Sequence, residues 1–381
     1  MSPNTNTTTY VVPQLLAQGL LALRQMAVMP RYVNRAYEAT AGEKGSSIDV
    51  PVPSAITAVA VTPSYVAPDD TGVSPTSVNI PLSEWYEAPF FLNDKEMLEV
   101  QSGTIPMQAT EAVKALANNV DNAILALYKD IYGYAGVAGT TPFGADLSEF
   151  LDARKVLNNQ LAPTDPRFVA INPDAEANAL GLRAFQDAAF RGDRDGILNG
   201  QIGFKLGSTW FMDQNIPTHT TGTVATSWIN KAGTAVLAGL KTLVSTTGGT
   251  AALLKGDVFT IAGDTQTYVL TANASRSGGG DLTILFEPAL KVTLAGSEVI
   301  TLKASHVANL AFHRDAFAFA SRPFAGADPM GLGVFQSAVD PISGLTLRLE
   351  VSRQYKRTRF AYDILYGVKT VRKELACRIA G

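Results

Sequence analysis

The sequence is poor in cysteine, histidine and charged residues. Its 381 residues include one cysteine, Cys377, which cannot form a disulfide within the chain and is expected to be a small buried side chain. Charged residues make up 17% of the chain, and the formal net charge of −3 lacks the basic footprint of a high-affinity nucleic-acid-binding protein. These shortages exclude an internal disulfide framework and disfavour sequence-specific binding of nucleic acid.

Long apolar runs are also missing. No segment reaches the roughly 18 uninterrupted apolar residues that would indicate a membrane-spanning helix. The nearest stretch, residues 11–29, is interrupted by Pro13 and Arg24 and lacks the basic start of a secretory signal peptide. We therefore expect no membrane partner and interpret this stretch as part of the mature protein.

Residue patterns for catalysis or metal binding are weak. His306 and His313 are seven residues apart and could share a helix face, but no cysteine or carboxylate pair completes a metal site, so structural histidines are expected. The sequence RGDRDG at 191–196 lacks the later acidic ligands of a calcium loop and is expected to be a solvated turn. No serine elbow or cysteine–histidine pair is present. The sequence thus predicts no catalytic residue, no metal, no cofactor and no enzyme.

The sequence does contain enough apolar material for large cores, since hydrophobic residues make up 46% of it. A chain of this length suits two or three domains. Because charged residues are depleted in the cores of protein interfaces, a surface with little charge is suited to extensive subunit contact.

Residues 108–132 have the clearest helical pattern. Apolar residues such as Val113, Leu116 and Val120 follow three-and-four spacing, and Gly133 marks the end of the pattern. It predicts a long amphipathic helix around which the rest of the chain is organised.

Two segments before this helix are expected to need partners. Residues 13–29 predict an amphipathic helix whose apolar face must dock on its own body or on a neighbour. Residues 46–94 alternate apolar and polar side chains on both sides of a Pro/Asp/Gly-rich tip, which predicts a long two-stranded excursion. A hairpin without a third strand is marginally stable, so another chain is expected to supply its missing contacts.

The remainder predicts a mixed α+β domain interrupted by an all-β region. Helical patterns at 146–163 and 174–190, the second capped by Asp174, flank a short strand at 167–173. Residues 223–303 are rich in Thr, Gly, Ala and Val and predict the short strands of a barrel or sandwich. Because the earlier pattern resumes afterwards, this region is interpreted as an insertion.

A basic patch, defined as Arg353, Lys356, Arg357 and Arg359, lies in the alternating segment 345–379. Four cations could meet phosphate groups. The alternation of cations with apolar residues favours a strand surface that faces acidic partners, and both interpretations stay open.

Four stretches resemble ones that recur in a known family: GILNGQIGFKLGSTWFMDQNIP at 196–217, LKGDVFTIAG at 254–263, LTILFEPAL at 282–290 and LAFHRDAFAFASRPF at 310–324. With the order of the segments, they make nearly the whole chain resemble the tailed-bacteriophage major capsid proteins of the Hong Kong 97-type fold. Within that family the chain is most similar to the subgroup with an inserted β-barrel, of the Salmonella podovirus type.

The resemblance implies an α+β capsid fold with a defined division of the chain. The expected parts are an amino-terminal arm with a helix at 1–43, an extended β loop at 44–95, a peripheral domain with a spine helix at 96–145, an axial domain at 146–222 and 304–344, an inserted β-barrel domain at 223–303, and closing peripheral strands at 345–381.

The resemblance also implies a structural subunit without an active site, arranged in hexamers and pentamers of an icosahedral virion capsid and present in the host cytoplasm during assembly. Expected partners are identical subunits, a scaffolding protein, a portal, a decoration protein, and double-stranded DNA held by non-specific contacts. The residues expected at subunit contacts are Leu15, Leu16, Leu20, Arg24, Arg31, Tyr65, Asp69, Asp70, Trp85, Arg191, Asp193, Arg194, Asp195, Arg353 and Arg357.

Other functions stay open. One is a nanocompartment shell of the same fold, which would package an enzyme instead of a genome. Another is a phage or surface adhesin whose residues 223–303 bind a carbohydrate. An enzyme is disfavoured because the histidines and carboxylates do not converge in the sequence.

Overall fold

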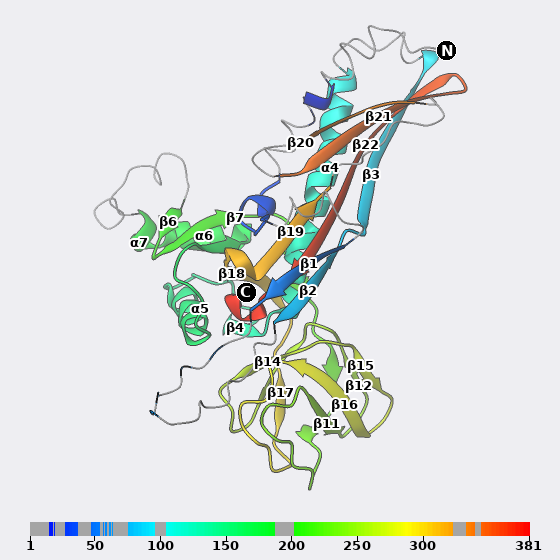
Figure 1. The fold of residues 1–381 in the computed structure, drawn as a ribbon. Helices are drawn as coiled ribbons and strands as arrows, with labels where there is room; N and C mark the ends of the chain where they lie inside the picture. The colour runs from blue at the N-terminus through cyan, green and yellow to red at the C-terminus, as the bar shows by residue number, and fades with distance from the viewer. Residues whose placement is uncertain are drawn as a thin grey trace. The chain divides into compact units, whose positions relative to one another are not determined.

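Figure 1 shows the computed structural model of the chain. It describes residues 15–17, 19, 27–36, 47–53, 56, 58, 61, 63, 75–95, 104–186, 202–322, 333–339 and 344–381. The chain divides into two units, and each is described by itself. Unit 1 comprises Met1–Gln25, Asn34–Leu116 and Ala318–Val371, and unit 2 comprises Met26–Val33, Ala117–Phe317 and Arg372–Gly381.

A five-stranded sheet forms the body of unit 1. Its strands are β3 (Glu84–Asn93), β19 (Phe317–Ser321), β20 (Gly333–Val339), β21 (Thr346–Gln354) and β22 (Arg357–Thr370). They are hydrogen-bonded in the order β19–β22–β21–β20, and β3 pairs with β22. The alternating residues Leu345, Leu347 and Leu349 are buried, as the pattern predicted. Lys356 has a φ of 52° in the tight turn between β21 and β22.

A separate two-stranded sheet consists of β1 (Ser47–Val52) and β2 (Thr76–Pro81), which confirms the expected hairpin strands. Its buried side chains share one cluster with residues of β19 and of the β2–β3 connection, namely Ile48, Val50, Ile80, Leu82, Ala318 and Ala320. The paired base of the hairpin is therefore covered by its own unit. This corrects the expectation that another chain supplies its contacts there; most of 54–74 lies outside the described residues.

Helix α4 (Thr104–Leu125) continues into the 3₁₀ helix η3 (Ala126–Asp130). Val113, Leu116 and Val120 are buried, which confirms the amphipathic pattern of 108–132. The final predicted turn is 3₁₀ instead of α, a common way for helices to end.

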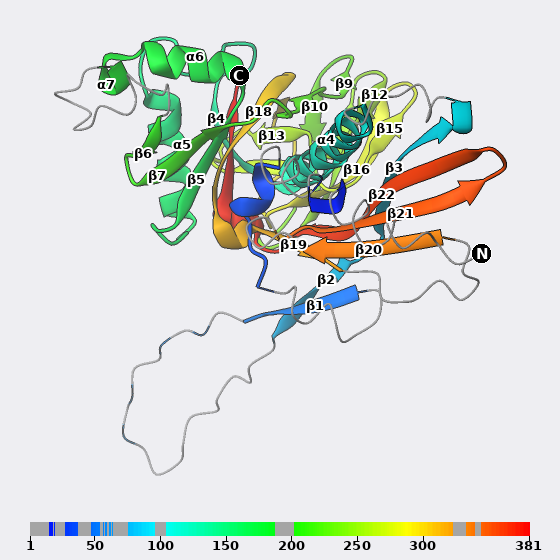
Figure 2. The ribbon, with the colours of Figure 1, turned by 90° about the horizontal axis from the view of Figure 1, so that it is seen from above.

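A seven-stranded sheet lies in unit 2. Its order is β4–β23–β18–β5–β7–β6, with β8 paired to β18. The strands are β4 (Gly133–Gly136), β5 (Arg167–Ile171), β6 (Gly203–Lys205), β7 (Ser208–Met212), β8 (Thr218–His219), β18 (His306–His313) and β23 (Ala376–Ala380). The helices are η2 (Met29–Arg31), α5 (Ser148–Asn159), α6 (Pro173–Gly181), α7 (Arg183–Gln186), η4 (Arg314–Ala316) and η5 (Lys373–Leu375). Helix α5 packs on β4 and β23 (Figure 2).

Two local expectations are wrong. Asn172, not Asp174, caps α6, because Pro173 occupies the first helical position and the Oδ1 of Asn172 accepts a hydrogen bond from the N–H of Ala175 at 3.3 Å. His306 and His313 lie on strand β18, so residues seven apart point to opposite faces and share no helix face. The helix predicted at 174–190 is divided into α6 and α7, and its last residues lie outside the described part.

The expected short strands are present between residues 223 and 303. They are β9 (Thr223–Val224), β10 (Trp228–Asn230), β11 (Thr242–Thr247), β12 (Ala251–Leu253), β13 (Val258–Ile261), β14 (Thr267–Leu270), β15 (Ala274–Arg276), β16 (Gly280–Glu287) and β17 (Ile300–Leu302). Six of them form a sheet in the order β10–β11–β16–β14–β13–β17, and β15–β12–β9 form a second sheet. Their core contains the ring contacts of Phe259, Tyr268 and Phe286.

The chain enters and leaves this β region by adjacent strands. His219 of β8 lies opposite His306 of β18, and Thr218 lies opposite Val307. The strand that leads into the β region and the strand that leads out of it are therefore hydrogen-bonded neighbours.

Candidate assembly surface

Strand β3 lies at an edge of the unit 1 sheet. It pairs with β22 along its whole length, from Glu84 opposite Tyr366 to Asn93 opposite Arg357, and with no other strand among the described residues. An edge strand presents unpaired backbone groups, so another chain can add to it.

Large apolar side chains are exposed along β3. Trp85 is 60% exposed and Phe91 is 58% exposed. The Nε1–H of Trp85 donates a hydrogen bond to Asp363 Oδ2 at 3.1 Å, which holds the indole in place while much of it faces solvent. Asp363 is itself held by Arg348, whose Nε lies 2.8 Å from Oδ1. Ordered aromatic side chains of this kind are typical of interface anchors.

Ion pairs connect the basic patch with β3 and with Asp94, the residue that follows β3. Arg359 Nη2 lies 2.7 Å from Glu87 Oε2, and Arg353 Nη2 lies 2.6 Å from Asp94 Oδ2. The hydrogen bond from Arg353 lowers the pKa of the Asp94 carboxyl. Half of the patch is thus neutralised within the chain, which disfavours a dedicated phosphate site.

The other two cations lie close to exposed aromatic rings. The guanidinium of Arg357 is 4.8 Å from the ring centroid of Phe91, and Lys356 Nζ is 5.2 Å from that of Tyr355. Such cation–π contacts bring positive charge and apolar area together at the β21–β22 turn.

The amino-terminal residues Leu15 and Leu16 are buried by their own unit. The hydroxyl of Tyr362 donates a hydrogen bond to the carbonyl oxygen of Leu15 at 2.9 Å. A Cβ built at Gly19 would lie 3.1 Å from Tyr362, so this segment leaves little room between itself and the sheet.

Three of the residues expected at subunit contacts lie on the sheet of unit 1: Trp85 on β3, Arg353 on β21 and Arg357 on β22. Arg353 and Arg357 lie close to the β21–β22 turn, whereas Trp85 lies near the other end of β3, opposite Leu365. Arg31 is exposed on η2 of unit 2. The remaining ones lie outside the described residues: Leu20, Arg24, Tyr65, Asp69, Asp70, Arg191, Asp193, Arg194 and Asp195.

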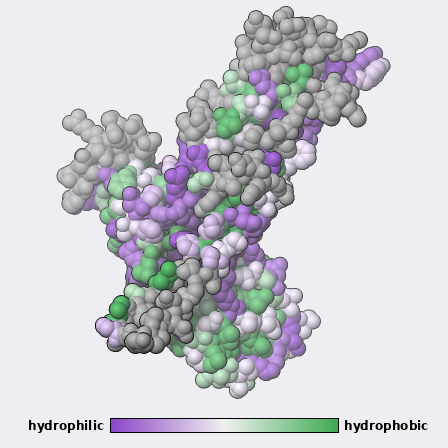
Figure 3. All heavy atoms as spheres, viewed as in Figure 1, coloured by the Kyte–Doolittle hydropathy of each residue, from purple (hydrophilic) through white to green (hydrophobic). Residues whose placement is uncertain are grey.

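A second exposed apolar patch lies on the β region of unit 2. The N–H of Leu290 donates a hydrogen bond to the carbonyl oxygen of Leu240 at 2.9 Å, and the exposed apolar side chains of these segments are Leu237, Leu240, Leu285 and Val292. Figure 3 shows apolar residues gathered on the viewed face of this region. The sequence alone did not identify this patch, because its residues come from separate loops and one strand.

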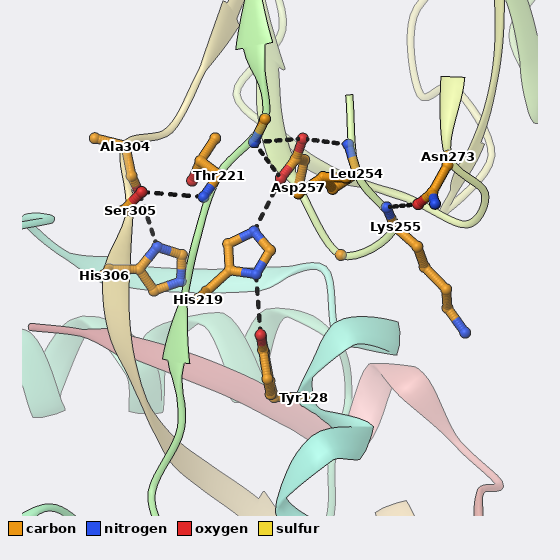
Figure 4. A network of polar contacts seen from close by, with 12 residues as sticks. Tyr128, His219, Thr221, Leu254, Lys255, Asp257, Asn273, Ala304, Ser305 and His306 are labelled. Atoms are coloured by element: carbon orange, nitrogen blue, oxygen red, sulfur yellow. Dashed lines mark hydrogen bonds and ion pairs between the residues drawn. The ribbon is translucent and has the colours of Figure 1, made fainter. Parts of the chain in front are cut away.

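Unit 2 also contains a buried polar network that the sequence did not reveal (Figure 4). His219 Nδ1 lies 3.0 Å from the hydroxyl of Tyr128, and its Nε2 lies 2.9 Å from Asp257 Oδ1. Asp257 also accepts backbone N–H groups of Gly222 and Leu254 at 3.2 and 2.8 Å. The network ties the turn before β13 to η3 and to β8.

Arg378 of β23 is fully buried beside this network. Its Nη1 donates to the carbonyl oxygen of Gly256 at 2.8 Å, and its guanidinium is 5.1 Å from the ring centroid of Tyr128. Burial lowers the pKa of Arg378 to about 10. Burial likewise lowers the pKa of His306 to about 4, while its Nδ1 lies 2.9 Å from the carbonyl oxygen of Ala304.

This arrangement supports a structural role. Both ring nitrogens of His219 are occupied by partners within the chain, so neither is available to a substrate. A hollow of about 650 Å³ lies beside the network and is lined partly by Lys129, Lys255 and Asn273. Within the described part of the chain, no group of three or more His, Cys, Asp or Glu side chains is arranged to hold a metal ion.

Across the described ranges, no helix combines the length and the apolar character needed to cross a bilayer.

Comparisons with known proteins identify the fold. No protein-family model and no curated protein matches the sequence. Among solved structures, the chain is similar to one from Mycobacterium phage Che8, with 16% identity, a TM-score of 0.51, and coverage of 92% of this chain and 90% of that one. It is also similar to the capsid structure of the cyanophage P-SCSP1u, with 11% identity, a TM-score of 0.51, and coverage of 88% and 83%. The chain thus has an α+β fold shared with a phage capsid structure.

Proposed function

We propose that the protein is the structural major capsid protein of a tailed bacteriophage, of the Hong Kong 97 type, and that it assembles into an icosahedral shell around double-stranded DNA. The observation that carries this proposal is the fold shared with a phage capsid structure over 88% of the chain. Agreement over so much of both chains supports a common architecture, and not one shared motif.

The surface of unit 1 fits this function. The edge strand β3 pairs with one strand among the described residues and carries the exposed aromatic side chains of Trp85 and Phe91. A capsid subunit needs such surfaces because large obligate interfaces bury more than about 2,000 Å². We assign this face, with the β21–β22 turn, to contacts with identical subunits in hexamers and pentamers.

The proposed division of the chain keeps the boundaries expected from the sequence. Residues 1–43 are assigned to the amino-terminal arm, 44–95 to the extended loop, and 223–303 to an inserted β domain. The pairing of His219 with His306 supports the insertion, because the chain leaves and rejoins the sheet at one place.

The other proposed partners follow from the function. Assembly with a scaffolding protein and a portal, and attachment of a decoration protein, are proposed only as components of such a shell. Non-specific contact with the enclosed DNA is proposed on the same basis, and the net charge of −3 disfavours tight binding.

The experiment is expression of the full chain, with its phage's scaffolding protein where required, followed by negative-stain electron microscopy and a nuclease-protection assay on particles from infected cells. Closed shells that protect DNA are expected. Shells that contain a protein cargo and no nucleic acid would favour a nanocompartment. A chain that stays monomeric under all assembly conditions would refute the proposal.

Deletion of residues 68–75 tests the assignment of the extended loop. The shortened chain should fold with unchanged circular dichroism and fail to close shells, because the loop tip would lie on an adjacent subunit. Normal particles from this variant would contradict the assignment.

A further inference from the structure

Asp121 of α4 is a buried carboxylate that holds a distant part of the chain. It is 1% exposed. Its Oδ2 accepts the backbone N–H of Val28 and its Oδ1 accepts that of Met29, each at 3.1 Å. One side chain thus fixes both N–H groups that lead into η2.

This attachment lies where the chain changes units. Residues Met26–Val33 belong to unit 2, although the segments on both sides of them belong to unit 1. Met29 and Val33 are fully buried in this stretch. A change in the two hydrogen bonds to Asp121 should therefore change how firmly residues 27–31 are held on α4.

Two charged groups act on Asp121 among the described residues. The first is Asp213, which follows β7 and is 3% exposed. Its Oδ1 accepts a hydrogen bond from the N–H of Asn215 at 2.8 Å. Its Oδ2 has no hydrogen-bond partner among the described residues. Arg31 of η2 carries the opposite charge. Asn215 Nδ2 also donates to Asn118 Oδ1, one turn before Asp121, at 3.4 Å. Two buried carboxylates thus act on each other with one cation nearby.

The surroundings of Asp121 and Asp213 favour the protonated form of Asp121. Burial, and after it the charge of Asp213, raise the pKa of Asp121 to about 7, although the two backbone N–H groups and Arg31 act in the opposite direction. Burial also raises the pKa of Asp213. A neutral Asp121 keeps lone pairs on both oxygens for Val28 and Met29 without placing a second negative charge beside Asp213.

We propose that Asp121 is a proton-operated latch for residues 27–31: the segment is held on α4 while Asp121 carries a proton, and loss of that proton loosens it. The inference does not depend on the capsid function. If that function holds, the latch makes the attachment of the amino-terminal segment sensitive to pH within the range of the host cytoplasm.

The sign follows from the two states. When the segment opens, Asp121 meets water, where an aspartate has a pKa of about 3.9. The closed state therefore binds the proton more tightly, and raising the pH favours opening. Between pH 5 and pH 8 the opening equilibrium rises by at most roughly 100-fold.

Hydrogen exchange of the full, unassembled chain tests the latch. Peptides that cover 27–33 are followed by mass spectrometry from pH 5 to pH 8, with rates corrected for the intrinsic pH dependence of exchange. Protection of the Val28 and Met29 amides should fall by 10- to 100-fold across this window. Constant or rising protection would overturn the proposal.

Three variants locate the effect. Asp121→Asn should abolish the pH dependence, and Asp213→Asn, which keeps Asp121 but removes its negative neighbour, should give a smaller fall that ends at lower pH. Glu111→Gln removes an exposed carboxylate of α4 and should leave the wild-type fall intact. If Asp121→Asn does not fold, the Asp213→Asn profile decides: a fall equal to that of the wild type rejects the latch.

Discussion

The carboxylate of Asp257 accepts a hydrogen bond from Nε2 of His219 at 2.9 Å, although the two residues lie on opposite sides of the point where the chain enters the β region. Asp257 is also fully buried and accepts two backbone N–H groups of its surrounding turns. The side chain of Asp257 therefore connects the β region with strand β8 of the seven-stranded sheet.

Replacing Asp257 by alanine should be strongly destabilising. The change leaves His219 Nε2 and two buried N–H groups without partners, so a loss of about 3–5 kcal/mol is expected. Tyr128→Phe removes only one hydroxyl and should cost about 1–2 kcal/mol. Urea denaturation of the unassembled chain measures both. Equal, small losses of unfolding free energy for the two variants would show that the hydrogen bonds of Asp257 contribute little to stability.

The stability of unit 2 should fall in acid through His306. Its folded pKa of about 4 lies below the value of about 6.5 expected in the unfolded chain, so the unfolded state takes up the proton first. Stability is complete above about pH 6.5 and decreases toward pH 4, by up to about 3 kcal/mol.

The comparison with His306→Gln isolates this contribution, because Asp121 changes stability in the opposite direction over the same range. The difference in unfolding free energy between wild type and variant should shrink as the pH falls from 7 to 4. His313→Gln, at the other end of β18, serves as the matched control. A difference that stays constant with pH would contradict the role of His306.

The Cys377 thiol should be unreactive in the folded chain. It is fully buried, and burial raises its pKa, so little thiolate forms at neutral pH and no reagent reaches it. Labelling with a chromogenic disulfide reagent at pH 8 should proceed at the rate of unfolding and become rapid in denaturant. Rapid labelling without denaturant would mean that β23 is open in solution.

Trp85→Ala and Phe91→Ala should separate folding from assembly. Both side chains are largely exposed, so their loss should cost the unassembled chain no more than about 1 kcal/mol. If β3 contacts another subunit, assembly measured by light scattering should fall at least 10-fold, because each removes an aromatic anchor. Leu151→Ala, which truncates a 52% exposed side chain on α5, is the control. Normal assembly of both β3 variants would reject this face as an interface.

The parts of the fold that depend on local periodicity could be predicted from the sequence. The three-and-four spacing of Val113, Leu116 and Val120 identified α4, and the alternation at Leu347 and Leu349 identified β21. The Ala- and Phe-rich run at 306–323 has no such period, because β18 and β19 are buried on both faces. The sequence therefore did not distinguish strands from a helix in this run, and it allowed a helix face shared by His306 and His313.

The polar sites could not be predicted, because they depend on contacts between distant residues. Tyr128 and His219 are separated by 91 positions, and Asp121 and Met29 by 92. No local pattern marks Asp121 as different from the exposed acid Glu111 on the same helix. Asp121 is removed from water only because η2 packs on α4, and this burial destabilises its ionised form.

The pairing of His219 with His306 bears on how such a chain can evolve. Both ends of the β region lie in one ladder, so a recombination event can add or remove the whole module without rearranging the sheet. The guanidinium of Arg378, however, depends on a carbonyl oxygen of that module. Homologues without the module are therefore expected to have another residue in place of this arginine, so the residue at this position should vary together with the presence of the module.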